Sequence, residues 1–180
     1  MVLTRREPDI LSNEALVKTL LKLPDKILHH HETDNLPNLI LHDLGHDKHL
    51  NLNRATFLVD SPDFDCLKGI AGFCKSECCM HHATDIWENP DKFSTDMQNA
   101  EFHQKINHFL HHSMKRRASD EQVLSELGRS LGIAKPHVFT WDMRHGNHGI
   151  LLYDTDNECL CQADNELLHH IAALLGLCPV

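Results

Sequence analysis

The sequence lacks long apolar runs and any excess of positive charge. Its apolar stretches, such as residues 39–41 and 171–175, are far too short to cross a bilayer. The first residues contain no apolar core, so no secretory signal is predicted. The formal net charge is −9, from 17 Lys and Arg against 26 Asp and Glu, which argues against a dedicated binder of nucleic acid or of an anionic membrane. We therefore expect a cytoplasmic protein with no membrane partner.

The sequence also lacks internal repeats and low-complexity linkers. Its 180 residues are the length of one ordinary domain, or of two very small ones. Apolar residues make up 41% of the chain and charged residues 24%, a balance typical of a globular protein that buries a core. We predict one α+β domain over residues 1–180.

The spacing of apolar residues and the turn residues between them predict several helices and a few short strands. Helices are predicted at residues 12–23, where Pro24 ends or kinks the helix, and at 25–31, 36–46, 66–87, 95–114, 120–131 and 165–175. Strands are predicted at residues 55–59, 138–141 and 150–153, with a hairpin loop at 144–149. The predicted fold class is α+β, with several helices packed on a small antiparallel sheet.

What the sequence has in excess is histidine, with 17 residues, beside seven cysteines. The number of cysteines is odd, and three of them crowd together as Cys74, Cys78 and Cys79. In a chain without a predicted signal, this pattern favours a reducing compartment and a metal or redox cluster over a disulfide framework.

The densest group of potential metal ligands lies in residues 74–82. If this stretch is helical, Cys74 and Cys78 share a face, and a histidine three or four residues later extends the row. Thiolate and imidazole are the ligands that zinc prefers, and they also suit copper(I) and iron–sulfur clusters. The predicted ligands of zinc, or of another transition metal such as iron, are Cys74, Cys78, Cys79, His81 and His82, with a further ligand from Cys66, Cys159, Cys161 or a remote histidine.

Two other interpretations of this segment stay open. Free cysteine is among the most buried residue types, so Cys78 and Cys79 could be small core residues. Either one could also be a nucleophile, because a neighbouring histidine such as His81 or His82 can hold a thiol as the thiolate.

A second candidate site is the stretch Leu39-Ile-Leu-His42-Asp43-Leu-Gly45-His46. It resembles the signature of HD-domain metal-dependent phosphohydrolases, in which an adjacent His-Asp pair follows an apolar run on a helix and ligates metal. The resemblance implies that His42 and Asp43 are metal ligands and that the protein hydrolyses phosphate esters. His42 and His46 also stand four residues apart, a spacing that lets two imidazoles hold one metal from one helical face. In the alternative interpretation, Gly45 ends the helix and the following residues are solvated.

A third pattern, residues 127–141, resembles the core of a helix-turn-helix. Gly128 would allow close contact between helices, Gly132 would make the turn, and Val138 and Trp141 would anchor the second helix. Basic residues stand nearby: Lys115, Arg116, Arg117, Arg129, Lys135 and Arg144. The alternative is a capped helix that leads into a strand, and the acidic net charge favours it.

The leading functional hypothesis is therefore a transition-metal-binding protein with a Cys/His-rich site. Its alternatives are metal-dependent phosphohydrolysis at the His42-Asp43 pair and DNA binding through residues 127–141. If the cysteine cluster and the His-Asp segment meet in space, one mixed metal site replaces the first two hypotheses.

Overall fold

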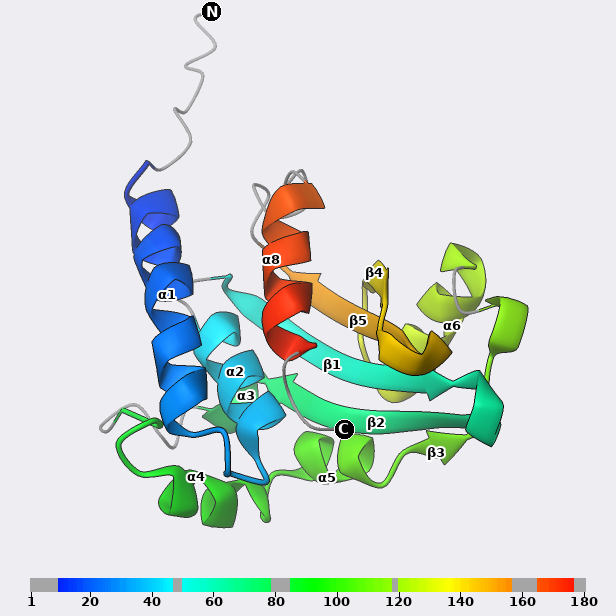
Figure 1. Cartoon of the computed structure of the whole chain (residues 1–180), viewed down its shortest axis with the longest axis horizontal. Coiled ribbons are helices and arrows are strands. Elements are labelled where there is room, and N and C mark those ends of the chain that lie inside the picture. The colour runs from blue at the N-terminus through cyan, green and yellow to red at the C-terminus, as the bar shows by residue number, and fades with distance from the viewer. Residues whose placement is uncertain (1–9, 47–49, 79–84, 118–119, 157–164, 177–180) are drawn as a thin grey trace, which may run out of the picture.

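The computed structural model describes residues 10–46, 50–78, 85–117, 120–156 and 165–176 (Figure 1). The helices are α1 (Ile10–His29), α2 (Leu36–Gly45), α3 (Lys75–Cys78), α4 (Pro90–Met97), α5 (Glu101–Asn107), α6 (Glu121–Leu131) and α8 (Asn165–Leu175). The strands are β1 (Leu52–Ser61), β2 (Cys66–Cys74), β3 (Leu110–His111), β4 (His137–Asp142) and β5 (His148–Thr155). These elements confirm the predicted α+β class.

The strands form an antiparallel sheet in the order β3-β2-β1-β5-β4. β1 is central, since it pairs with β2 on one side and with β5 on the other. The hairpin of β4 and β5 confirms the two late strands that the sequence predicts. Among the described helices, none has the length and apolar composition needed to cross a membrane.

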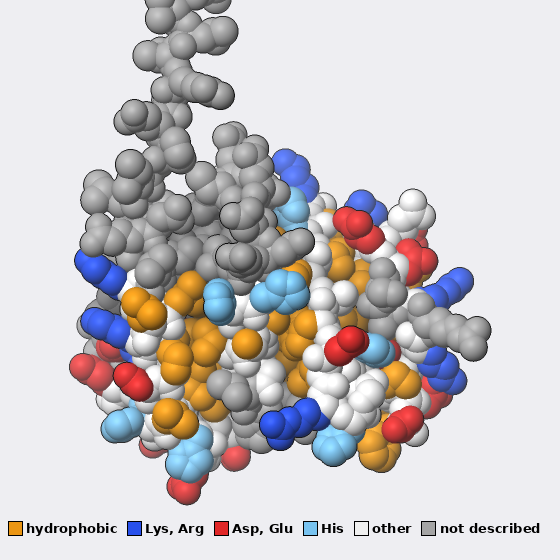
Figure 2. Space-filling view, turned by 45° about the horizontal axis from the view of Figure 1, so that its top comes forward, with side chains coloured by type: hydrophobic (Ala, Val, Ile, Leu, Met, Phe, Trp, Pro, Cys, Tyr) orange, Lys and Arg blue, Asp and Glu red, His pale blue; other side chains and the backbone are white. Residues whose placement is uncertain are grey.

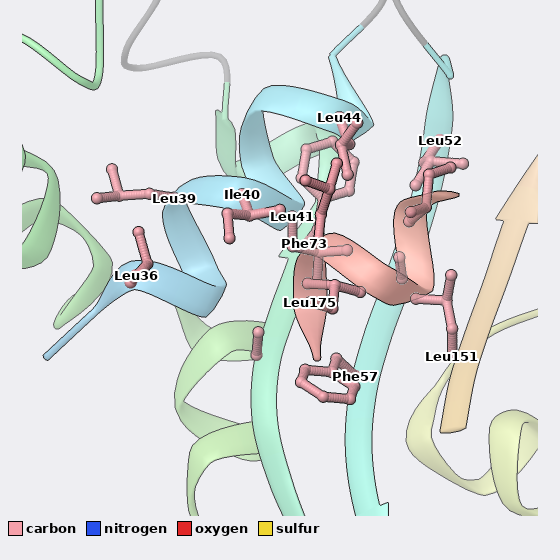
Figure 3. Packing of buried hydrophobic residues seen from close by; sticks show 14 of the residues in the cluster. Leu36, Leu39, Ile40, Leu41, Leu44, Leu52, Phe57, Phe73, Leu151 and Leu175 are labelled. Atoms are coloured by element: carbon pink, nitrogen blue, oxygen red, sulfur yellow. The ribbon is translucent and has the colours of Figure 1, made fainter. Parts of the chain in front are cut away.

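Side chains alternate between the two faces of the sheet, and each face has its own core. The first core contains Phe57 of β1 with Phe73 and Leu151 of its neighbours, packed against α2 and α8 (Figure 3). Residues of α1 and α4 also belong to this core. The second core contains Leu58 of β1 with Leu152 of β5, and α5 and α6 cover it. Helices therefore lie on both faces of the sheet.

α1 continues through Pro24, so its predicted end at residue 23 is wrong. A proline inside a helix removes one backbone hydrogen bond. Leu23 and Ile27, before and after the proline, are both buried in the first core. Packing on both sides of Pro24 therefore holds the helix together.

Residues 66–87 do not form the predicted helix, because residues 66–74 are β2 and only Lys75–Cys78 are helical before the described chain is interrupted. Two glycines of β2 explain why this stretch is a strand packed against α5. A Cβ on Gly69 would lie 1.9 Å from the carbonyl oxygen of Ile106, and one on Gly72 would lie 2.9 Å from the Ile106 side chain. The glycines thus let α5 pack directly on β2.

The single helix predicted over residues 95–114 is also wrong, since this stretch contains the end of α4, then α5 and β3. Phe93 and Met97 of α4 are buried in the first core, whereas Phe102 and Ile106 of α5 are buried in the second. The chain passes round the edge of the sheet between them, and one straight helix could not supply both cores.

The predicted helix-turn-helix is wrong. α6 ends at Leu131, Gly132 takes a left-handed conformation with φ of 101°, and residues 137–142 then form β4 instead of a second helix. Val138 and Trp141 therefore pack within the sheet. A capped helix followed by a strand, the alternative interpretation, is what these residues form.

Candidate functional site

His42 lies where α2 covers the outer edge of β2. Its Nε2 donates a hydrogen bond to the carbonyl oxygen of Gly72 at 3.2 Å, and the Gly72 N–H donates to Asn38 Oδ1, also at 3.2 Å. β3 pairs with Leu67 and Lys68, and farther along β2 the two α2 side chains satisfy the outer backbone groups of Gly72. The buried His42 ring also packs edge-on against Phe73 and Phe93. In this arrangement His42 holds a helix on a strand.

Asp43 points to a different set of partners. Its Oδ2 accepts hydrogen bonds from Lys26 Nζ at 3.0 Å and from Trp87 Nε1 at 2.8 Å. The Lys26 ammonium group also lies 5.3 Å from the centre of the Trp87 ring, a cation–π contact. Asp43 therefore joins α1 and α2 to the segment before α4. The two residues of the predicted His-Asp pair thus have separate structural partners.

The cysteine cluster starts at the end of β2. Cys74 is the last residue of that strand; its thiol is buried beside the second core and lies 3.2 Å from the Ser76 hydroxyl. Cys78 is the last residue of α3. Cys79, His81 and His82 lie outside the described residues, as do Cys159 and Cys161. Cys66 lies at the opposite end of β2.

Several chain segments meet at the end of the sheet where Cys74 lies. The end of β2 is beside the start of β1 and the end of β5, because Arg54 pairs with both Cys74 and Asp154. Lys75 Nζ donates to Asn51 Oδ1 at 2.8 Å, and the Asn51 N–H donates to the carbonyl oxygen of His46 at 3.1 Å. The end of α2, with His46, is therefore close to the first residues of the cysteine cluster.

Within the parts of the chain that are described, no three Cys, His, Asp or Glu side chains converge closely enough to hold a metal ion. Two surface histidines instead have local partners. His148 Nδ1 lies 3.1 Å from Asp142 Oδ1, and His112 Nδ1 lies 2.9 Å from Asp65 Oδ2. The hydrogen bond with His112 lowers the pKa of Asp65 below its usual value, and Lys115 adds to this effect. The first contact joins the end of β4 to the start of β5, and the second joins the residue before β2 to the residue after β3.

The sequence did not predict four buried polar atoms that share one property, the lack of a hydrogen-bond partner. In the described structure, Thr56 Oγ1, Asp60 Oδ2, His103 Nδ1 and Trp141 Nε1 have no hydrogen-bond partner. His103 Nε2 lies 2.8 Å from the Asn107 amide nitrogen, which donates to it, so the neutral ring carries its proton on Nδ1. Burial lowers the pKa of His103, while the nearby carbonyl of Gly72 opposes the shift without reaching hydrogen-bond geometry to Nδ1. The apolar spacing around His103 contained no signal for this environment.

The lowered pKa of His103 predicts acid sensitivity. Below the ordinary histidine pKa of about 6.5, the unfolded chain binds this proton more readily than the folded chain does. The free energy of unfolding should therefore fall as the pH drops through and below this value. Replacing His103 with glutamine should flatten this part of the curve in urea unfolding measured from pH 7.5 to 5. The same change at the exposed His108 should leave the curve parallel to that of the original protein. Parallel curves for both variants would refute the lowered pKa of His103.

In comparisons with family models, with curated proteins and with solved structures, this chain has no match.

Proposed function

We propose that the protein binds a transition metal, with zinc as the first choice, through the cysteine–histidine segment that follows β2. The observation that carries this proposal is the position of Cys74 at the end of β2 and of Cys78 at the end of α3. Both stand at the end of the sheet, and three further residues of ligand type, Cys79, His81 and His82, follow within four positions in the sequence. Thiolate and imidazole groups in this number are enough for a closed zinc site, which usually has four ligands.

The surroundings of this end of the sheet support the proposal. His46, at the end of α2, is linked to Lys75 through Asn51. The segment with Cys159 and Cys161 follows β5 in the sequence, and β5 ends beside the start of β1. Residues of ligand type thus belong to three segments that adjoin one end of one sheet. A mixed site that includes His46 is more compatible with these contacts than one built on the His42-Asp43 pair.

Binding by Cys74 requires a local rearrangement. Its thiol is buried and contacts the Ser76 hydroxyl, so a metal would have to replace that contact. Cys78, Cys79, His81 and His82 supply four ligands without it. We therefore expect Cys78 to be more important for metal binding than Cys74.

Metal analysis tests the proposal directly. Protein purified without a chelator or a histidine tag should contain about one zinc ion per chain, and several thiols should resist modification until a chelator is added. Replacing Cys78 with serine should remove most of the metal and lower the melting temperature, because metal binding contributes to folding free energy. The matched control is Cys66→Ser, at the other end of β2, which should keep the metal.

Two results would contradict the proposal. One is metal-free protein in which all seven cysteines react freely without chelator. The other is a Cys78→Ser variant that keeps its metal as fully as Cys66→Ser does. Phosphohydrolysis through His42 and Asp43 stays a prediction without support from the contacts of these residues.

A further inference from the structure

α5 begins without a capping side chain of its own. Its N-cap residue is Ala100, whose methyl group cannot accept a hydrogen bond. Glu77 of α3 supplies the missing acceptor, because its Oε1 accepts a hydrogen bond from the Phe102 backbone N–H at 2.8 Å. Phe102 is the second residue of α5, where a capping side chain normally accepts. A residue 25 positions earlier in the chain therefore caps this helix.

α3 depends on its neighbours for its position. It has four residues, Lys75–Cys78, about one turn of helix. A single turn is unstable by itself in water, because forming it costs more conformational entropy than its hydrogen bond recovers. Two of its side chains bind other elements: Lys75 Nζ donates to Asn51 Oδ1 at 2.8 Å, just before β1, and Glu77 binds α5. The backbone that leads to Cys78 is thus attached to two separate parts of the fold.

The residue that Glu77 binds is itself firmly placed. The Phe102 side chain is buried in the second core, and the Arg54 guanidinium lies 5.2 Å from the centre of its ring. Glu77 is therefore attached to a buried residue instead of a surface loop. Since Cys78 is the next residue after Glu77, this contact also fixes the backbone of Cys78 at the end of the sheet.

We propose that Glu77 is a positioning residue of the metal site: by capping α5, it holds the backbone of α3 in the place from which Cys78 binds the metal. This inference rests on the proposed function. A ligand on an ordered backbone loses less conformational entropy when it binds, so the same ligands bind more tightly. Without the Glu77 carboxylate the ligands are all kept, but the ordering of α3 then opposes metal binding.

Competition with a chromogenic chelator, on the full chain, measures the zinc dissociation constant. Glu77→Ala should raise this constant about tenfold while the protein still binds the same amount of zinc, because no ligand is removed. Glu77→Gln should restore most of the affinity, since its side-chain oxygen can accept the same hydrogen bond from Phe102. Circular dichroism should show that both variants keep the fold, because the Glu77 side chain is only partly buried.

Attraction of the cation by negative charge is the other way in which a carboxylate could favour zinc binding. Acidic and basic side chains are interspersed on the face that Figure 2 shows. The matched control is Glu101→Ala, which removes an exposed carboxylate from the same turn of α5. An effect of charge alone would make Glu77→Gln and Glu101→Ala both weaken zinc binding, whereas capping of α5 by Glu77 predicts that neither does.

Amide hydrogen exchange gives a readout that a purely structural role of Glu77 would not change. Zinc should slow the exchange of the Phe102 amide in the original protein, because metal that orders α3 also strengthens its contact with α5, and it should not do so in Glu77→Ala. A Glu77→Ala variant that binds zinc as tightly as the original protein, or a Glu77→Gln variant as weak as Glu77→Ala, would overturn this inference alone. An original protein that binds no zinc would overturn the proposed function and this inference with it.

Discussion

Replacing Gly69 with alanine is expected to lower the free energy of unfolding by about 3 kcal/mol, at the upper end of the cost of overpacking a core. The added Cβ would lie 1.9 Å from the carbonyl oxygen of Ile106 and 2.8 Å from its carbonyl carbon. These are backbone atoms, so no side chain can rotate to make room. The Gly69 N–H also donates to the carbonyl oxygen of Phe109 at 2.9 Å, which ties this residue of β2 to the chain after α5. The variant must therefore move α5 away from the sheet.

Urea unfolding followed by circular dichroism measures this effect. The control is Lys68→Ala, at the neighbouring exposed residue of β2, which should change the free energy of unfolding by no more than about 0.5 kcal/mol. A Gly69→Ala variant as stable as this control would show that α5 does not pack directly on β2.

The second large effect is expected at Asp43. Its replacement by alanine should lower the free energy of unfolding by about 2 kcal/mol, because Lys26 and the Trp87 indole lose their shared acceptor. Replacement by asparagine should lower the free energy of unfolding less than replacement by alanine, since the asparagine side-chain oxygen can still accept a hydrogen bond from Trp87. Tryptophan fluorescence during unfolding would report the change close to Trp87.

The control for Asp43 is Asp142, which also contacts a basic side chain but has 93% of its own side chain exposed. Asp142→Ala should change the free energy of unfolding by no more than about 1 kcal/mol, the range of exposed ion pairs. If Asp43 instead acts only as a metal ligand, its alanine variant would lose phosphatase activity and keep its stability. That outcome would favour the phosphohydrolase hypothesis over the structural role.

The elements that the sequence predicts well are those with strong local signals. Pro37 in the first turn of α2, the left-handed Gly132 after α6, and the apolar hairpin of β4 and β5 all stand where the residues place them. Each of these signals acts within a few residues. Local chemistry was therefore enough for the fold class and for three of the strands.

The errors arise where distant packing decides the local structure. In β2, a register shift opposite Phe57 and Leu58 interrupts the alternation of apolar residues, and the two glycines reflect contacts with α5. Between α4 and α5, the chain changes from one face of the sheet to the other without a glycine or a proline to mark the break. Neither cause can be read from a short window of sequence.

The candidate site was predictable in composition but not in arrangement. The crowding of cysteine and histidine after residue 74 is visible in the sequence. The separate partners of His42 and Asp43 are not, because both residues bind groups that are distant in the chain. The same is true of His103, whose burial depends on the position of α5 against β2.

The central position of β1 has a consequence for folding during synthesis on the ribosome. β1 pairs with β5, so that Leu58 lies opposite Ile150. The sheet therefore cannot be completed until most of the chain has left the exit tunnel. Pairing between such distant residues gives a high contact order and slow folding. Until β5 emerges, the apolar faces of the β1–β2 hairpin are accessible to chaperones and to other nascent chains.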